Sequence, residues 1–434
     1  MRIPRGSLTQ STARPPKVAS RLPFYYGWVV AGVITATGYA SAVIINPTLS
    51  IFVKPITTEF QWDRSVFAAA ATIGTLLGGV LALGVGPIVD RFGARWVLFI
   101  AFAMMGTTLV VLGNINGLVQ FYAAIILSRM LLQGIINLTS SVVVAKWFVR
   151  MRGQAMALTN LGQRLGGATI PLLAQLVTDR FGWRSAATSL GILSWATTLV
   201  PVLLWLRRQP QDMGLAPDGL AGDQAQERPE QASRRPSAAT EVSFTLGETL
   251  RTPTFYLLLV AFSAFTFVNT GILFNLIPLL TDRGLTTTSA VAILTTWSVV
   301  GMPATVGVAF LVDKLPLRYI LMIAYAGSAM GVLILTQATT PIPGFLFAAL
   351  HGWFFAIGLF LQNLVPANYY GPASLGSIRG VLTPLLMVSN AMGPLAATLV
   401  FDLMGDYAPL LWVDLGLLAT MSAAMFLARP PRRH

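Results

Sequence analysis

The sequence contains no cysteine, two histidines and few charged residues, which make up 10% of its 434 positions. Without cysteine the chain can form neither disulfides nor thiolate metal sites. It also lacks the phosphate-binding pattern GxxxxGK(S/T), the zinc motif HExxH, the nucleophile motif GxSxG and any cluster of carboxylates suited to a metal. We therefore expect no enzymatic activity, no ATP-driven transport, no cofactor and no bound metal.

Apolar residues take the place of the missing charge and make up 55% of the chain. A soluble domain carries roughly 25% charged residues, so most of this chain is not suited to face water. Apolar segments of about 20 residues, long enough to cross a hydrocarbon core roughly 30 Å thick, recur twelve times, beginning with 25–48. Their hydrophobicity is continuous, which favours helices over a β-barrel. The expected fold class is an all-α membrane protein with twelve transmembrane helices.

One charged loop occurs twice along the chain. GPIVDRFGARWVLF (86–99) and AFLVDKLPLRYILM (309–322) align Asp90 with Asp313, 223 residues later. This spacing is too long for a solenoid repeat. Between apolar runs, the repeat indicates a membrane transporter built from two six-helix pseudo-repeats.

Two polar stretches divide the chain. The region 207–252 is rich in Pro, Gln, Ala and charge, which is typical of a flexible connector. The expected organisation is a disordered cytoplasmic tail (1–22), an N-terminal six-helix half (23–206), the cytoplasmic connector (207–252), a C-terminal six-helix half (253–428) and a short cytoplasmic tail (429–434).

Positive charge predicts the orientation. Placing the N-terminus in the cytoplasm assigns 22 Lys and Arg to inner segments and five to outer loops, namely Lys54, Arg64, Arg180, Arg184 and Arg283. Because Lys and Arg near helix ends stay cytoplasmic, both termini are expected inside a bacterial-type cytoplasmic membrane. The net charge of +13 is thus mainly a topology signal with some attraction to membrane lipids. The basic residues are spread over short segments, so no nucleic-acid partner is expected.

The loop GPIVDRFGARW resembles the inner-loop motif G-x-x-x-D-R-x-G-R-(R/K) of the major facilitator superfamily, and the second copy lies where that family repeats it. The resemblance implies the major facilitator fold and secondary active transport by alternating access. YYGW (25–28), EFQWDRS (59–65), KWFVRMRGQAMAL (146–158) and PQDMGLAPDG (210–219) resemble the branch that holds the oxalate/formate antiporters and the monocarboxylate transporters. That branch implies a small organic anion as substrate, carried by proton symport or by anion exchange. Export of drugs or other amphipathic compounds is the alternative, and the protein is expected to act as a monomer.

The inner-loop motif and its repeats are expected to form a gate on the cytoplasmic side. Asp90 can accept hydrogen bonds from a neighbouring helix N-terminus, and the arginines supply matching cations. The alternative is that these charges only cap helices and set topology. The inner-gate residues are Gly86, Asp90, Arg91, Gly93, Arg95, Arg152, Asp313, Lys314, Arg318 and Arg379.

Two arginines lie in the middle of predicted helices, Arg129 and Arg164, each roughly 16 Å deep. A cation at this depth is costly and usually faces a watery cavity or a partner. Arg164 is expected to bind the carboxylate of an anionic substrate, since a planar guanidinium forms two hydrogen bonds with it; a structural partner such as Asp63 or a helix carbonyl is the alternative. Arg129 belongs to RMLLQG (129–134), one residue longer than the superfamily motif R-x-x-Q-G. It either organises backbone carbonyls or contacts substrate or proton.

Further polar and aromatic side chains complete the predicted site. The substrate-binding candidates besides the two arginines are Gln133, Asn137, Asn160, Tyr39, Asn269, Trp297, Trp353 and Asn390. The proton-coupling candidates are His351, Asp63 and Asp402. The eighth predicted helix lacks the basic residue that its apparent relatives carry, so lactate or oxalate is not transferred as the substrate. The expected partners are a small organic anion, protons and membrane lipids.

Overall fold

The computed structural model describes residues 24–148, 151–213, 215, 218, 244–312, 314–371 and 375–431. In these residues the chain forms helices and no strands. Eleven helical stretches are long and apolar enough to span a membrane. One of them, α7 (Arg152–Trp205), turns at Gly182, whose φ of 80° only glycine adopts readily. Residues 152–181 and 183–205 are therefore two crossings, which gives the twelve expected for this fold class.

The first crossing differs from its predicted limits of 25–48. It consists of α1 (Gly27–Ser41), a 3-10 turn η2 (Ala42–Ile44) and α2 (Asn46–Phe60). Ile45 is extended between them, with φ −71° and ψ 163°. Pro47 explains the break, because proline is accommodated in the first turn of a helix but disrupts a helix interior. The helix then continues well beyond residue 48.

The remaining elements of the N-terminal half are α3 (Arg64–Phe92), α4 (Ala94–Leu112), α5 (Leu118–Met130), the π-helical stretch η3 (Leu131–Ile136), α6 (Asn137–Trp147) and α7. The C-terminal half consists of α11 (Pro253–Asp282), α12 (Thr287–Leu311), α13 (Leu317–Thr336), α14 (Pro341–Tyr370), α15 (Leu375–Met404) and α16 (Ala408–Met425). Two short helices, η4 (Pro210–Met213) and α10 (Leu246–Leu250), lie outside the two bundles.

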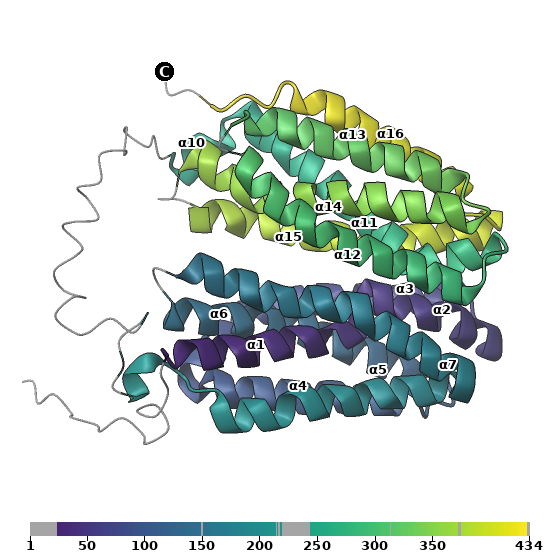
Figure 1. Ribbon diagram of the computed structural model, residues 1–434, viewed down its shortest axis with the longest axis horizontal. Helices are drawn as coiled ribbons and strands as arrows, with labels where there is room; N and C mark the ends of the chain where they lie inside the picture. Colours follow the sequence, from purple (N-terminus) through teal and green to yellow (C-terminus); the bar gives the residue numbers. More distant parts are fainter. Residues whose placement is uncertain are drawn as a thin grey trace, which may run out of the picture.

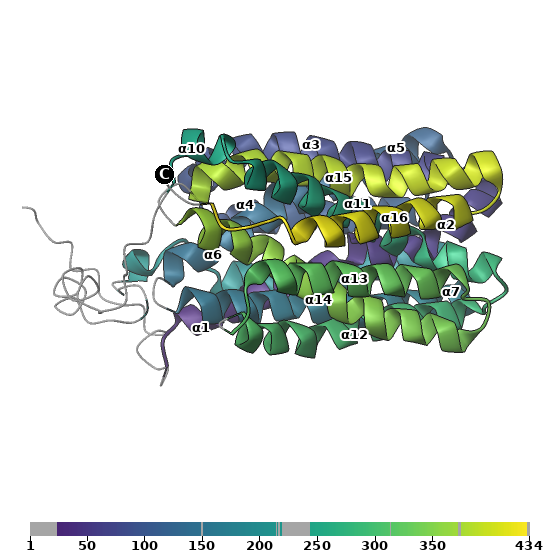
Figure 2. The ribbon, with the colours of Figure 1, turned by 90° about the horizontal axis from the view of Figure 1, so that it is seen from above.

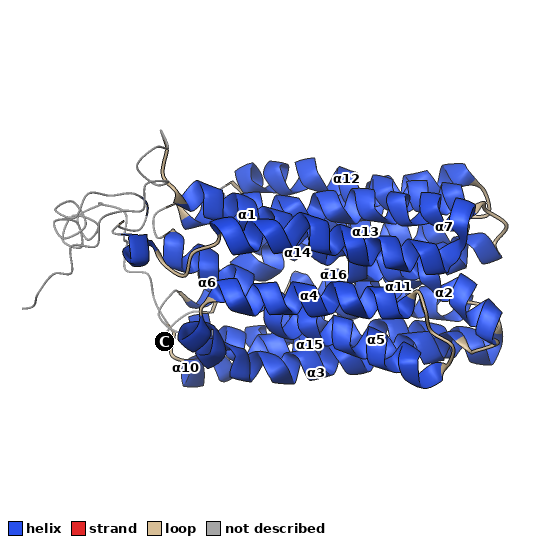
Figure 3. Ribbon diagram, turned by 90° about the horizontal axis from the view of Figure 1, so that it is seen from below, coloured by secondary structure: helices blue, strands red, loops and turns tan. Residues whose placement is uncertain are grey.

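The two halves form separate helix bundles that lie side by side (Figure 1). Views from above and below show the long helices running roughly parallel to one axis (Figures 2 and 3). Three helix pairs join the halves: α3 with α15, α7 with α12, and α2 with α11. We call the side on which α1 begins and α16 ends the inner side, because its charge predicts that it faces the cytoplasm, and the opposite side the outer side.

Orientation can be tested with reporter fusions. We expect reporters placed within 1–22, 207–252 and 429–434 to be active in the cytoplasm, because these segments carry most of the basic residues. A pair of enzymatic reporters, one active only in the cytoplasm and one only outside, gives the readout. Activity of the external reporter in the connector would contradict the predicted topology. Residues 1–22 and most of the connector lie outside the described residues.

Candidate functional site

Arg164 of α7 reaches from one half of the molecule to the other. Its Nη2 donates a hydrogen bond to the hydroxyl of Thr305 on α12 at 3.1 Å, and that hydroxyl donates to the carbonyl of Gly301 at 2.9 Å. Gly301 leaves room for the side chain, because a Cβ there would lie 3.2 Å from Nη1 of Arg164. Among the described residues no carboxylate pairs with this half-buried guanidinium. Its remaining donors are therefore available to an anion.

Two more hydrogen bonds join α7 and α12. Thr295 donates to the carbonyl of Ala168 at 3.2 Å, and Ser298 donates to the carbonyl of Gly167 at 3.4 Å. Since α12 runs from the outer to the inner side, the bond between Arg164 and Thr305 is the innermost of the three. Arg164 thus makes the innermost of these three hydrogen bonds between the halves.

A cavity of about 100 Å³ lies within the N-terminal half, and Gln163, the neighbour of Arg164 in the sequence, is among the residues that line it. Residues of α1, η3, α6 and α7 line it, and its polar groups include Asn137, Ser140, Asn160 and Gln163. Asn137 Nδ2 also donates to Gln133 Oε1 at 3.2 Å. The structure therefore brings together three predicted substrate-binding residues, Gln133, Asn137 and Asn160.

Arg129 has a different environment from Arg164. It is 3% exposed, and its Nε and Nη2 donate to the hydroxyl of Thr75 at 3.2 and 3.0 Å. Its Nη1 donates to the carbonyl of Ile44 at 3.1 Å. The break in the first helix leaves that carbonyl without its helical donor, because the amide of Thr48 bonds to the carbonyl of Ile45 instead. Arg129 thus satisfies backbone that the break exposes, as membrane interiors require.

We expect Arg129→Met to impair folding rather than binding. The substitution leaves the Ile44 carbonyl and the Thr75 hydroxyl without a donor, which costs about 1–3 kcal/mol of unfolding free energy. Thermal unfolding of the purified variant in detergent measures the loss, and ligand affinity of the folded fraction should remain close to that of the parent. Normal stability combined with lost affinity would instead place Arg129 among the substrate-binding residues.

The stretch after Arg129 is π-helical over six residues, from Leu131 to Ile136. A π-bulge accommodates one additional residue within an α-helix. The segment 129–134 is one residue longer than the motif that it resembles, so the bulge accounts for the difference. The bulge packs closely against α3, since a Cβ on Gly78 would lie 2.8 Å from the Cβ of Gln133. Because Gln133 lies within the bulge, the bulge determines the direction in which this side chain leaves the helix.

His351, the predicted proton-coupling histidine, is completely buried inside the C-terminal half. Its Nδ1 accepts a hydrogen bond from Trp297 Nε1 at 3.0 Å, and the ring of Phe347 lies 5.0 Å away. Its Nε2 has no partner among the described residues. Trp297 is 8% exposed, so neither side chain is open to a substrate in this conformation.

The other predicted substrate-binding residues are dispersed. Tyr39 is half-buried on α1 and accepts a hydrogen bond from Thr169 at 3.2 Å. Asn269 is buried and donates to the carbonyl of Phe265 in its own helix at 2.6 Å. Asn390 is half-buried and its Oδ1 has no partner among the described residues, whereas Trp353 is exposed.

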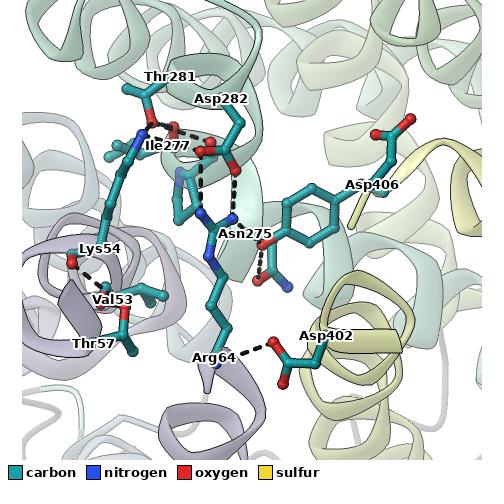
Figure 4. Close-up of polar contacts among 12 residues, drawn as sticks. Val53, Lys54, Thr57, Arg64, Asn275, Ile277, Thr281, Asp282, Asp402 and Asp406 are labelled. Atoms are coloured by element: carbon teal, nitrogen blue, oxygen red, sulfur yellow. Dashed lines mark hydrogen bonds and ion pairs between the residues drawn. The ribbon is translucent and has the colours of Figure 1, made fainter. Parts of the chain in front are cut away.

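The outer side carries a polar cluster whose pairing the sequence does not predict. Asp282 at the end of α11 accepts two hydrogen bonds from Arg64 on α3, at 2.5 and 3.0 Å, and one from Lys54 on α2 at 3.0 Å. Figure 4 shows the two basic side chains converging on this carboxylate from the N-terminal half. The Arg64 side chain is 12% exposed and that of Asp282 is 26% exposed. This ion pair therefore joins the halves in a partly dehydrated setting.

Asp402 of α15 caps the N-terminus of α3. Its two carboxylate oxygens accept hydrogen bonds from the amides of Arg64 at 3.2 Å and Ser65 at 2.8 Å. Amides in the first helical turn have no partner within the helix, and an anion there also interacts favourably with the helix dipole. Asp63, which occupies the N-cap position, forms no capping hydrogen bond. A carboxylate of one half therefore caps a helix of the other. Two of the three proton-coupling candidates, Asp63 and Asp402, are exposed on the outer side.

Tyr407 adds a neutral member to the cluster. Its hydroxyl accepts from Arg64 Nη1 at 2.9 Å and donates to Asn275 Oδ1 at 3.3 Å. Burial raises the pKa of Tyr407 to about 12, so the hydroxyl stays protonated at physiological pH. The Phe401 ring lies 3.8 Å from the Arg64 guanidinium. We call Lys54, Arg64, Asp282, Asp402 and Tyr407 the outer clamp.

The described residues of the predicted inner gate form no hydrogen bond or ion pair between the halves. Arg91 and Lys314 are exposed, Arg318 donates to the hydroxyl of Tyr319 at 2.9 Å, and Arg379 donates to the carbonyl of Asn363 at 3.1 Å. Arg95, half-buried, has an Nε without a partner among the described residues. The side chains of Asp90 and Arg152 and the whole of Asp313 lie outside the described residues.

The two motif glycines differ. Gly93 has a φ of 81° between α3 and α4, which accounts for glycine there. A Cβ on Gly86 would meet no other group within 4 Å. Among the described residues, no close approach of another helix therefore requires glycine at position 86 in this conformation.

Two helical halves that contact each other through three helix pairs place the chain in a class of multi-pass membrane proteins. The chain belongs to the Major Facilitator Superfamily, whose family model matches residues 30–394. Members of this family are membrane transporters and not enzymes, and the chain is a multi-pass membrane protein.

Sequence relatives match the chain over part of its length. The "Membrane sensor protein UhpC" of Salmonella typhimurium is 29% identical over 184 residues, which cover 42% of this chain and 41% of that protein. Human "Monocarboxylate transporter 1" is 25% identical over 175 residues, or 38% of this chain and 33% of that protein. The chain spans about two fifths of the length of the first of these relatives and a third of the second.

Solved structures share the fold along nearly the whole chain. The crystal structure of a D-xylose-proton symporter superposes with a TM-score of 0.69 at 16% identity, covering 92% of this chain and 97% of that one. A bacterial homologue of the human lysosomal transporter Spinster, in an inward-facing and occupied conformation, gives 0.66 at 14% identity, covering 93% and 96%. At this level of identity the similarity establishes the fold.

Proposed function

We propose that this protein moves a small organic anion, a carboxylate, across the cytoplasmic membrane, either with protons or in exchange for another anion. The observation that carries the proposal is Arg164, a cation in the middle of a membrane helix, at the contact between the halves, with a neutral hydroxyl as its hydrogen-bond acceptor. Such residues mark substrate pathways in transporters. The partial similarity to a monocarboxylate transporter supports the same substrate class.

The geometry suggests how an anion would change the conformation. A hydrogen bond to a charged acceptor contributes roughly 1.5–3 kcal/mol, against about 1 kcal/mol for a neutral one, so a carboxylate competes with Thr305 for the guanidinium. Binding would break the hydrogen bond between Arg164 of α7 and Thr305 of α12. A ligand that favours one arrangement of the halves shifts the equilibrium towards it. A closed outer clamp is what an inward-facing state would have under the predicted topology.

Uptake into proteoliposomes tests the proposal. A panel of radiolabelled carboxylates is offered with and without an imposed pH gradient, and with and without unlabelled anion inside. We expect accumulation of at least one carboxylate that depends on the gradient or on the internal anion. Transport of neutral or cationic amphipathic compounds in preference to every anion would favour the drug-export alternative. Anion binding without flux would favour a sensor, the role that the name of the UhpC relative gives.

A further inference from the structure

Among the described residues, no charged side chain lines the cavity of the N-terminal half, and seven of its eleven lining residues carry a polar side chain. Its lining contains the amides of Asn137, Asn160 and Gln163 and the hydroxyl of Ser140. Asn160 and Gln163 are exposed and form no side-chain hydrogen bond with described residues, so their donors and acceptors are unused. Unused amides in a membrane domain indicate a ligand or water that needs both donors and acceptors. Hydroxyl groups have this property, whereas an alkyl chain does not.

The cavity also has a fixed position relative to Arg164. Asn160 and Arg164 lie four residues apart on α7 and so share a face, separated by about 6 Å along the helix axis. Asn160 lines the cavity of the N-terminal half, and Arg164, one turn further along, bonds to Thr305 of the C-terminal half. A volume of 100 Å³ holds about three water-sized groups. One molecule can therefore place a carboxylate at Arg164 and a few hydroxyl groups in the cavity.

We propose that this cavity is a subsite for the hydroxylated part of the transported anion and that the substrate class is a polyhydroxylated monocarboxylate. The inference rests on the proposed function, since Arg164 supplies the carboxylate site. In this arrangement Arg164 selects for charge, and Asn160 and Gln163 select for hydroxyl groups along the chain. A purely aliphatic acid of equal length would leave the amides unpaired and bind more weakly.

The experiment compares three probes by ligand-induced thermal stabilisation of the purified full-length protein. Gluconate has both a carboxylate and hydroxyl groups, hexanoate has the same number of carbons without hydroxyl groups, and sorbitol has the hydroxyl groups without the carboxylate. We expect the parent to bind gluconate at least tenfold more tightly than hexanoate, and sorbitol more weakly still. Asn160→Leu and Gln163→Leu should each weaken gluconate binding by about three- to tenfold and change hexanoate binding less than twofold.

Gln154→Leu is the matched control, because it removes an exposed amide from the same helix outside the cavity. Its affinities should equal those of the parent. Melting of the unliganded variants shows whether each folds, and Asn160→Ser, which keeps a polar group, should retain part of the gluconate preference if Asn160→Leu does not fold.

The outcomes separate the two proposals. Equal binding of gluconate and hexanoate would overturn the subsite and leave the anion site intact. Sorbitol binding as tight as that of gluconate would overturn the carboxylate proposal itself. Binding of neither acid would overturn the substrate class, and a loss of gluconate affinity in Gln154→Leu equal to that in Asn160→Leu would overturn the role of the cavity.

Discussion

Arg164→Gln is expected to lower the affinity for the transported carboxylate by at least about 30-fold. Removing one partner of a charge-assisted pair typically costs on the order of 2–5 kcal/mol, and each 1.4 kcal/mol is a factor of ten. Arg164→Lys keeps the charge but loses the planar pair of donors, so its affinity should lie between those of the parent and Arg164→Gln. Ligand-induced thermal stabilisation of the purified variants, with an anion that stabilises the parent, gives the measurement.

Arg180→Gln is the matched control, because Arg180 is an exposed arginine on the same helix near the outer side. It should bind the anion as tightly as the parent. If Arg164→Gln also retained full affinity but gave less folded protein, Arg164 would be a structural residue that holds α7 against α12, and the anion proposal would lose its main support.

The sequence predicts the depth of the two central arginines but not their different environments. The expected depth of each arginine in the membrane follows from its position within an apolar run, and that position can be read from the sequence. The partners depend on how helices rotate and on where they break. Arg129 is buried against Thr75 and Ile44 because the first helix breaks at Ile45. Pro47 is the residue in the sequence that is consistent with this break. The extra residue in the segment 129–134 is consistent with the π-bulge, but it does not indicate which helix the bulge packs against.

The outer clamp could have been found from exceptions to the charge pattern. Lys54 and Arg64 are two of the five basic residues that the predicted topology assigns to outer loops, and both bind Asp282. Arg184, a third, pairs with Glu59 inside the N-terminal half. Three of the five outer cations thus have an acidic partner, but the sequence does not say which acid lies opposite each of them. For Lys54 and Arg64 the identity of the acid depends on how the two halves pack, because the paired residues are more than 200 positions apart in the sequence.

Asp282→Asn is expected to shift the protein towards conformations that are open on the outer side. Breaking a buried ion pair costs 3–5 kcal/mol, and an exposed pair contributes at most about 1 kcal/mol. Since the Arg64, Asp282 and Lys54 side chains are 12%, 26% and 43% exposed, we expect about 1–2 kcal/mol, or a roughly 5- to 30-fold change in the ratio of closed to open conformations. The loss falls on the closed state, because the basic groups are hydrated once the halves separate.

Distances between spin labels on the two halves measure this shift, and the absence of native cysteine means that introduced cysteines are labelled without background. Thr58→Cys and Thr288→Cys place one label on each half at exposed outer positions. Asp282→Asn should increase the population of long distances between them. Glu59→Gln is the matched control, because Glu59 is an outer carboxylate that bonds to Trp183 and Arg184 within its own half and does not join the halves. Unchanged distances in Asp282→Asn, or equal lengthening in both variants, would show that the clamp does not hold the outer side closed, and the contacts of α3 with α15 and of α7 with α12 would then have to account for closure.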